Sequence, residues 1–180
     1  MRLWLSLSSD LGVLVGEAEM GAKSTAMNPL GPGHSPWKDL AQRFKFQNPS
    51  PSMMTRTAHP LSDEEHELLE AGATLFDAGK FWHAHEAWED LWNDLKRRRA
   101  SDHEILLVQG MIQTAALLLH HQRKNVGGVE KQWAKLTPKL EGWSVAWGFD
   151  IERHLETIGT YVLDNGTWAL TAAHHQLPRA

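Results

Sequence analysis

The stretch EILLVQGMIQTAALLLHHQ, residues 104–122, decides the expected fold. Read as a helix, it carries apolar side chains almost all round, which indicates a central helix packed on several sides. Ser101, with Glu104 three residues later, forms a capping-box pattern that predicts where this helix begins. A chain of 180 residues built around such a helix is expected to hold one all-α domain.

Apolar residues recur at helical spacing on both sides of this stretch, and polar residues mark where helices begin. Four further helices are expected to begin near Ser62, Phe81, Asn125 and Asp150. Gly79 is expected to stop the first, the second should reach about Arg98, and Pro138 should bend or end the fourth early. The pattern predicts a compact bundle of about five helices over residues 61–166, with no strand.

The two flanks of this region have a different composition. Residues 1–56 are rich in proline, glycine and serine, so we expect a disordered or weakly structured arm that folding does not need. Residues 167–180 are expected to form a C-terminal tail, frayed after Ala173.

Composition narrows the classes of function. The net charge of -4 argues against a nucleic-acid binder, and the basic run at 96–99 is expected to complement a helix end instead. The absence of cysteine excludes disulfides and thiolate metal sites. No apolar run is long enough for a membrane span, and Asp10 interrupts the one signal-like segment. A cytoplasmic location is therefore expected.

The segment FWHAHEAWEDLW, residues 81–92, mixes aromatic, acidic and imidazole side chains. On a helix, its tryptophans at 88 and 92 and Phe81 fall on one apolar stripe. His85 falls inside that stripe and Glu89 on its edge, whereas His83 points away, toward the surface. We therefore interpret the aromatic residues as core and His85 with Glu89 as part of an internal polar site.

The central helix carries a matching polar strip, formed by Gln109, Gln113 and His120. The short connection at 96–102 makes the two helices antiparallel neighbours. Counting outward from it, His85 is level with Gln113, and Glu89 with Gln109. Gly110 is expected to allow close approach of these helices. Buried amides and imidazoles need hydrogen-bond partners, so the two strips predict one coupled site.

These two segments together resemble family 309 of the domains of unknown function, small helical bacterial proteins with an AHE..E..W segment followed by a QG.IQ.A segment. The resemblance covers about residues 75–140. It implies roles for His85, Glu86, Glu89, Trp92, Gln109, Gly110, Gln113 and Asn125. The sequence departs from the family pattern at His83, Lys124 and Gly128. Members are sometimes catalogued as predicted metal-dependent hydrolases.

Three hypotheses follow for the polar site. In the first, His85 and Glu89 hold a divalent metal in a hydrolase, although the sequence offers no clear third ligand. In the second, His85 acts as a general base oriented by Glu89, and the two glutamines bind a small polar ligand. In the third, the cluster is a structural network that fixes helix register. Trp82 and Trp168 are candidates for a contact between copies of the chain.

Overall fold

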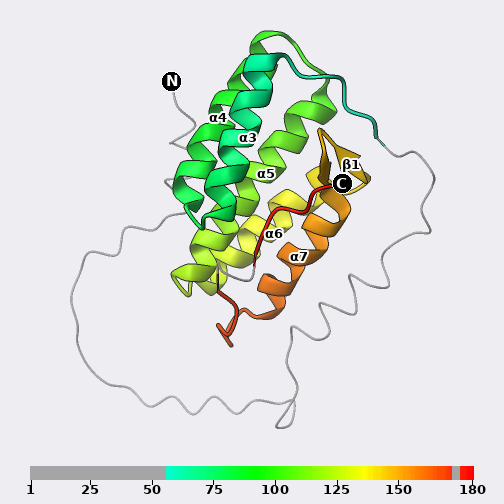
Figure 1. Ribbon diagram of the computed structural model, residues 1–180. Helices are drawn as coiled ribbons and strands as arrows, with labels where there is room; N and C mark the ends of the chain where they lie inside the picture. The colour runs from blue at the N-terminus through cyan, green and yellow to red at the C-terminus, as the bar shows by residue number, and fades with distance from the viewer. Residues whose placement is uncertain (1–55, 172–174) are drawn as a thin grey trace, which may run out of the picture. The chain divides into compact units, whose positions relative to one another are not determined.

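The computed structural model describes residues 56–171 and 175–180, so the predicted arm lies outside the described residues apart from Arg56. Within them the chain is mostly helical, which confirms the all-α prediction (Figure 1). The helices are α3 (Asp63–Asp77), α4 (Phe81–Arg97), α5 (Asp102–Gln122), α6 (Val126–Leu140) and α7 (Ile151–Leu163).

Side-chain caps set most of the helix starts, at the positions that the sequence predicts. Ser62 and Ser101 each accept a hydrogen bond from the backbone three residues on, and Glu65 and Glu104 complete the two capping boxes. Asn125 and Asp150 cap α6 and α7 through their side-chain oxygens. Pro138 lies inside α6, which ends two residues later at Leu140.

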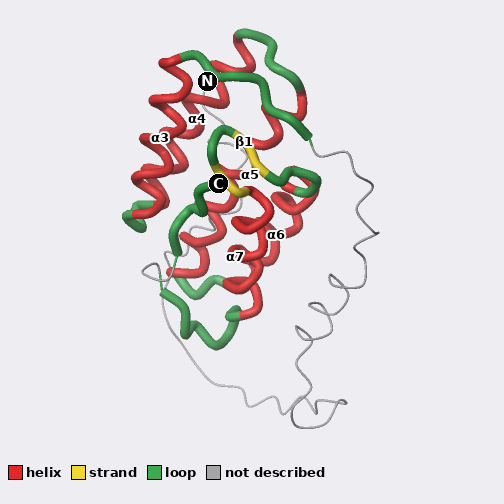
Figure 2. The backbone as a smooth tube through the Cα atoms, turned by 45° about the vertical axis from the view of Figure 1, so that its right-hand side comes forward, coloured by secondary structure: helices red, strands yellow, loops and turns green. Residues whose placement is uncertain are grey.

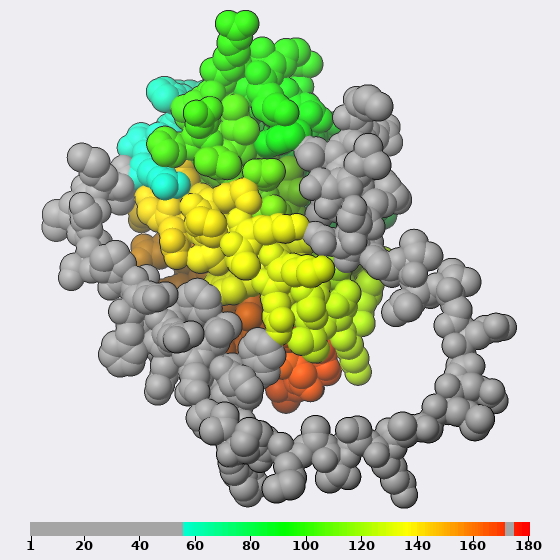
Figure 3. Space-filling view, turned by 180° about the vertical axis from the view of Figure 1, so that it is seen from behind, coloured from blue at the N-terminus to red at the C-terminus, as the bar shows by residue number. Residues whose placement is uncertain are grey.

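Helix α5 is the central element. It packs against both α4 and α6, and α3 completes the bundle on the far side of α4 (Figure 2). The side chains that fill the centre of the bundle are almost wholly buried: Leu107, Val108, Met111, Leu117 and Leu118 from α5, with Phe76, Trp88 and Leu91 from α3 and α4. Seen from behind, α6 lies across the middle of the molecular face (yellow in Figure 3).

Two glycines let the helices approach closely. A β-carbon at Gly72 would lie 2.2 Å from Nε1 of Trp88, so α3 and α4 can meet at this distance because position 72 has no side chain. A β-carbon at Gly110 would lie 2.6 Å from Cδ2 of Leu140. The close approach predicted at Gly110 is therefore between α5 and α6, and the expectation that it serves the α4–α5 contact is wrong.

A short hairpin lies between α6 and α7, and the prediction that the domain has no strand is wrong. Its strands are β1 (Val145–Ala146) and β2 (Phe149–Asp150), paired antiparallel with Ala146 opposite Phe149. Two-residue strands leave no alternating pattern in the sequence, which is why periodicity misses them. The hairpin turn uses positive φ angles at Trp147 and Gly148.

Residues 175–180, which we call the C-terminal segment, pack against the helical domain, and the prediction that they fray is wrong. The segment (red in Figure 1) runs to the hairpin, where Phe149 and Arg179 form a β-bridge. The backbone N–H of Leu177 donates to Asp77 Oδ1 at 2.6 Å. Both terminal guanidinium nitrogens of Arg179 bind the carboxylate of Glu70, at 2.7 and 2.8 Å.

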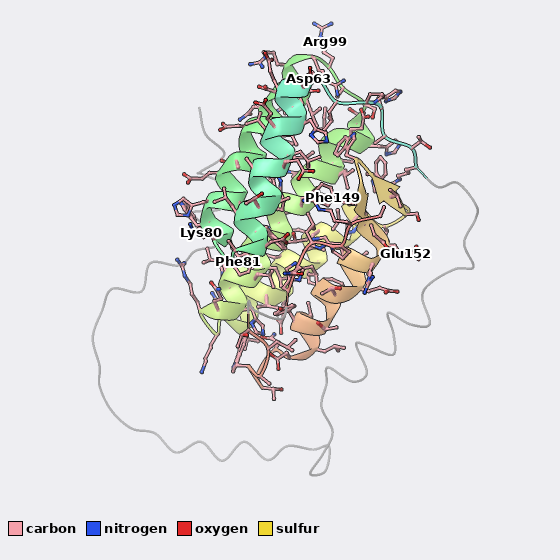
Figure 4. The ribbon with its side chains drawn as sticks, viewed as in Figure 1. Asp63, Lys80, Phe81, Arg99, Phe149 and Glu152 are labelled. Carbon is pink, nitrogen blue, oxygen red and sulfur yellow. The ribbon has the colours of Figure 1, made fainter. Side chains whose placement is uncertain are left out.

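The basic run at the end of α4 makes specific contacts in addition to complementing the helix end. Arg98 Nε donates to Glu65 Oε1 at 2.6 Å and so joins α4 to the start of α3. Arg97 pairs with Asp94 one turn earlier. Arg99 has a positive φ of 59° in the connection to α5 and projects away from the helices (Figure 4).

Candidate functional site

Helix α4 separates a core face from a polar edge, as the sequence predicts. Trp88 is fully buried and donates its indole N–H to the carbonyl of Leu69 at 3.1 Å. Trp92 lies farther round the helix, where the ammonium of Lys96 sits 3.9 Å from the ring centroid. His83 is exposed, and Glu86 is exposed next to the buried His85.

His85 is a buried imidazole on α4. The side chain is 8% exposed, and its Nδ1 atom has no partner among the described residues. The ring stacks on Trp82, with the two planes 7° apart and the centroids 5.8 Å apart. Burial lowers the pKa of His85, and the nearby Glu86 carboxylate only partly opposes this effect. The imidazole is therefore held in its neutral form near neutral pH.

Gln113 lies on the side of α5 that faces α6. Its Oε1 atom accepts a hydrogen bond from Lys139 Nζ at 2.9 Å, and the same ammonium donates to the carbonyl of Lys135 at 2.7 Å. Burial lowers the pKa of Lys139, and repulsion from Lys135 lowers it further. Sequence reasoning missed Lys139, which follows Pro138 near the end of α6, where no motif draws attention to it.

The four residues of the predicted site lie on adjacent helices, α4 and α5. Glu89 and Gln109 are half buried, and within the described residues no hydrogen bond joins His85 to Glu89, Gln109 or Gln113. The coupled site stays a prediction. Of its four members, Gln113 has a hydrogen bond that the structure defines, and its partner comes from α6.

Asn125 belongs to a second polar cluster at the far end of α5. Its Oδ1 accepts from the Gly128 N–H at 2.9 Å, and its Nδ2 donates to His120 Nδ1 at 3.2 Å. Asn125 thus caps α6 while fixing the His120 ring. This contact gives Asn125 a structural explanation that does not require a ligand.

A third polar cluster, formed by His121 and Asp164, is buried near the end of α7. His121 Nε2 lies 2.9 Å from Asp164 Oδ2. Burial opposes ionisation of Asp164, but N–H donation from Leu170 and Ala169, together with His121, outweighs it and lowers the pKa. The carboxylate thereby anchors the loop after α7. Trp168 packs edge-on against the His121 ring.

Sequence reasoning also missed the buried histidines His154 and His175. His154 is fully buried on α7, whereas its neighbour Leu155 is half exposed. The helical spacing from Ile151 through His154 to Ile158 carries this signal, but a polar residue on an apolar face is easily overlooked. His175 had no helical pattern around it.

Among residues 56–171 and 175–180, no group of three or more His, Cys, Asp or Glu side chains is placed to hold a metal ion. His85 and Glu89 therefore offer at most two protein ligands from this part of the chain. None of the helices that the structure describes is long and apolar enough to cross a membrane.

Comparison with known proteins finds one family model that matches part of this chain. Residues 66–132 match the model of a family described as Domain of unknown function (DUF309), which confirms the resemblance drawn from the two sequence segments. The match runs from α3 into α6 and includes His85, Gln113 and Asn125, whereas Lys139 lies beyond it. Neither the curated proteins nor the solved structures contain a match to the chain.

Proposed function

We propose that this chain, with its DUF309 match over α3 to α6, binds a small polar ligand bearing a carboxylate or phosphate group, held by Gln113, Lys139 and His85. The observation that carries the proposal is the environment of Lys139. Its half-buried ammonium is bonded to two neutral oxygens, from Gln113 and Lys135, and has no carboxylate partner among the described residues. A cation withdrawn from water is unfavourable unless an anion accompanies it.

The hydrogen-bonding capacity left at this position suits an acidic group. An ammonium has three N–H donors, and two of those on Lys139 are used. The Gln113 amide accepts through Oε1, which leaves its N–H donors for another partner. Such a set of donors matches the several acceptor lone pairs of a carboxylate or phosphate.

His85 supports the proposal through its unpartnered nitrogen. Counting from the α4–α5 connection puts His85 level with Gln113, and a buried ring nitrogen without a partner is unfavourable in a purely structural role. A neutral imidazole can donate from one nitrogen and accept at the other, so it suits a polar ligand whatever the ligand's protonation state. Glu89 and Gln109, half buried on the same two helices, would border the ligand.

The two other hypotheses have less support. A structural network should provide a hydrogen-bond partner for Nδ1 of His85. The described residues provide none. For a metal-dependent hydrolase using His85 and Glu89, no observation on the described residues supplies the third ligand. The proposal is therefore one of binding, without an assigned reaction. We further propose a cytoplasmic location, in keeping with the absence of cysteine.

The test is ligand-induced stabilisation of the full chain by a panel of small carboxylic acids and phosphate esters, followed by titration calorimetry with the best of them. Lys139→Met should weaken binding at least about tenfold, because a charge-assisted hydrogen bond is lost. Lys80→Met, which removes an exposed lysine from the start of α4, serves as the control and should bind as the unmodified chain does. A panel without any stabilising compound, or binding that survives Lys139→Met unchanged, would contradict the proposal.

A further inference from the structure

Residues 177–180 of the C-terminal segment are held by polar contacts. Leu177 and Arg179 bind Asp77 and Glu70 of α3. The Asp150 N–H donates to the carbonyl of Pro178, and the Ala180 N–H donates to the carbonyl of Gly148, each at 3.0 Å. The segment therefore ties the β-hairpin to α3, which lies about a hundred residues before the segment in the chain.

The first residue of the segment is buried in a different way, because no described residue forms a hydrogen bond with its polar atoms. His175 is 1% exposed, and neither of its ring nitrogens has a hydrogen-bond partner among the described residues. Aromatic rings surround it: Phe76 at 4.6 Å, His154 at 5.6 Å and Tyr161 at 5.8 Å between centroids. Phe76 meets the imidazole edge-on.

His154, the neighbour of His175, is held as a single neutral tautomer. The Thr114 hydroxyl donates to the carbonyl of Met111 at 2.7 Å, so its oxygen must accept from His154 Nε2, 3.2 Å away. The proton of His154 is therefore on Nε2, and Nδ1 is an acceptor without a partner. Within the part of the chain that the structure describes, three buried nitrogens of these two rings have no hydrogen-bond partner.

The charged groups around this pair are already committed to other partners. Asp77 of α3 accepts from the Leu177 backbone, and Glu70 is paired with Arg179. From α7, Tyr161 donates its hydroxyl to the carbonyl of Thr171, and at the hairpin Asp150 caps α7. No carboxylate contacts either imidazole among the described residues, so a proton on His175 or His154 would be a buried, unpaired charge.

We propose that the C-terminal segment is a pH-sensitive latch, closed while His175 and His154 are neutral and released when His175, once exposed to water, takes up a proton. Release would uncover the apolar surface of Phe76 and Phe149 beside the hairpin. The polar contacts of Leu177 and Arg179 fix where the segment docks on α3. The His175 imidazole, which is neutral in the aromatic cage, makes docking of the segment depend on pH.

The direction and size of the effect follow from linkage. Burial lowers the pKa of His175 to about 4, and burial together with repulsion from His175 lowers that of His154 to about 3, from an ordinary value of 6.5. The released state therefore binds protons more strongly than the docked state below pH 6.5. Between pH 7.5 and pH 5, His175 alone shifts the equilibrium about 30-fold toward release, and exposure of His154 adds to this.

Hydrogen exchange of the full chain, corrected for the pH dependence of the intrinsic rate, tests the latch. Protection of residues 175–180 should fall about 30-fold or more between pH 7.5 and pH 5, and at both pH values it should be weaker than that of α5, because the segment opens without global unfolding. His175→Phe fills the cage with a ring that does not titrate. In this variant the loss of protection between pH 7.5 and pH 5 should be about 30-fold smaller than in the unmodified chain. His83→Phe, on the exposed side of α4, should leave it intact.

Two results would overturn the latch: equal protection of residues 175–180 at both pH values, or the same loss in His175→Phe as in the unmodified chain. If His175→Phe does not fold, an NMR titration of the histidine ring protons in the unmodified chain decides. A His175 that titrates near pH 6.5 while the segment stays protected would show that the buried ring tolerates its charge, and the proposal would be wrong.

Discussion

The imidazole of His120 lies directly against the backbone of Gly128: a β-carbon at position 128 would come within 2.3 Å of the ring nitrogen Nδ1. The same ring accepts from Asn125, the residue that caps α6. The end of α5 and the start of α6 are therefore packed together through one ring and one glycine.

Gly128→Ala is expected to destabilise the protein by about 1 to 3 kcal/mol, because the ring must move and lose its bond to Asn125. Gly127→Ala is the matched control: the nearest atom to a β-carbon there is 4.0 Å away, and alanine is the better helix former. Urea unfolding should give a lower midpoint for the first variant and an equal or higher one for the second. Equal midpoints would mean that His120 is free to shift.

Glu104→Ala is expected to cost on the order of 2 kcal/mol. Its buried carboxylate accepts from the backbone N–H groups of His59 and Ser101 and from the Ser101 hydroxyl. Burial opposes ionisation, yet these bonds outweigh it and lower the pKa of Glu104. The stabilisation is therefore complete above pH 4.5 and lost as pH falls through the lowered value. Exposed Glu67→Ala is the control, and thermal melts at pH 7 and pH 3.5 compare the two.

His85→Leu is expected to leave stability unchanged or to raise it, because an imidazole nitrogen without a partner is replaced by an apolar group. The same change should weaken binding of any acidic ligand found by calorimetry. Chemical unfolding of the unliganded protein measures the first effect. A loss of 2 kcal/mol or so would favour the structural-network hypothesis instead.

Leu177→Ala is expected to destabilise the protein by about 2 kcal/mol or more, since the side chain is buried at the docked C-terminal segment. Leu163→Ala removes the same atoms from a side chain that is 52% exposed and should cost much less. Calorimetric melting of both variants makes the comparison. If the two changes are equally mild, the segment contributes little to stability.

Acid should weaken the fold before the carboxylates titrate. The unfolded chain binds protons at His154 and His175 below pH 6.5, whereas the folded chain does so only near pH 3 and pH 4. His154→Phe should therefore flatten the fall in unfolding free energy between pH 6 and pH 5 by about 1 kcal/mol per pH unit. His83→Phe, at an exposed position, should keep the slope of the unmodified chain.

The helix starts could be predicted because the signals are local. Ser62 with Glu65, and Ser101 with Glu104, occupy their capping boxes, and each box depends on residues three apart. The core tryptophan at 88 followed from helical spacing alone. The polar strips of α4 and α5 could be found in the same way, since a periodic face needs no knowledge of its partner.

What could not be predicted depends on contacts between distant residues. The sequence predicts that Gly110 contacts α4, but its neighbour is Leu140 of α6. No pattern within α5 shows which of the two helices the glycine faces. Lys139 reaches Gln113 across 26 positions, and Leu177 reaches Asp77 across 100. Residues 175–180 have no helical or strand pattern of their own, so the sequence predicts a frayed end. Their burial comes wholly from elements formed elsewhere in the chain.

The docking of the C-terminal segment bears on the order in which the chain folds. Helices α3 to α6 each contact the next across short connections, so they can assemble as soon as they are synthesised. The contacts of Leu177 and Arg179 close loops of about a hundred residues and must come last. A nascent domain therefore passes through a stage in which the aromatic cage beside Phe76 is built but empty. We expect the uncovered cage to be a binding site, at that stage, for a chaperone or for the same segment of a neighbouring chain.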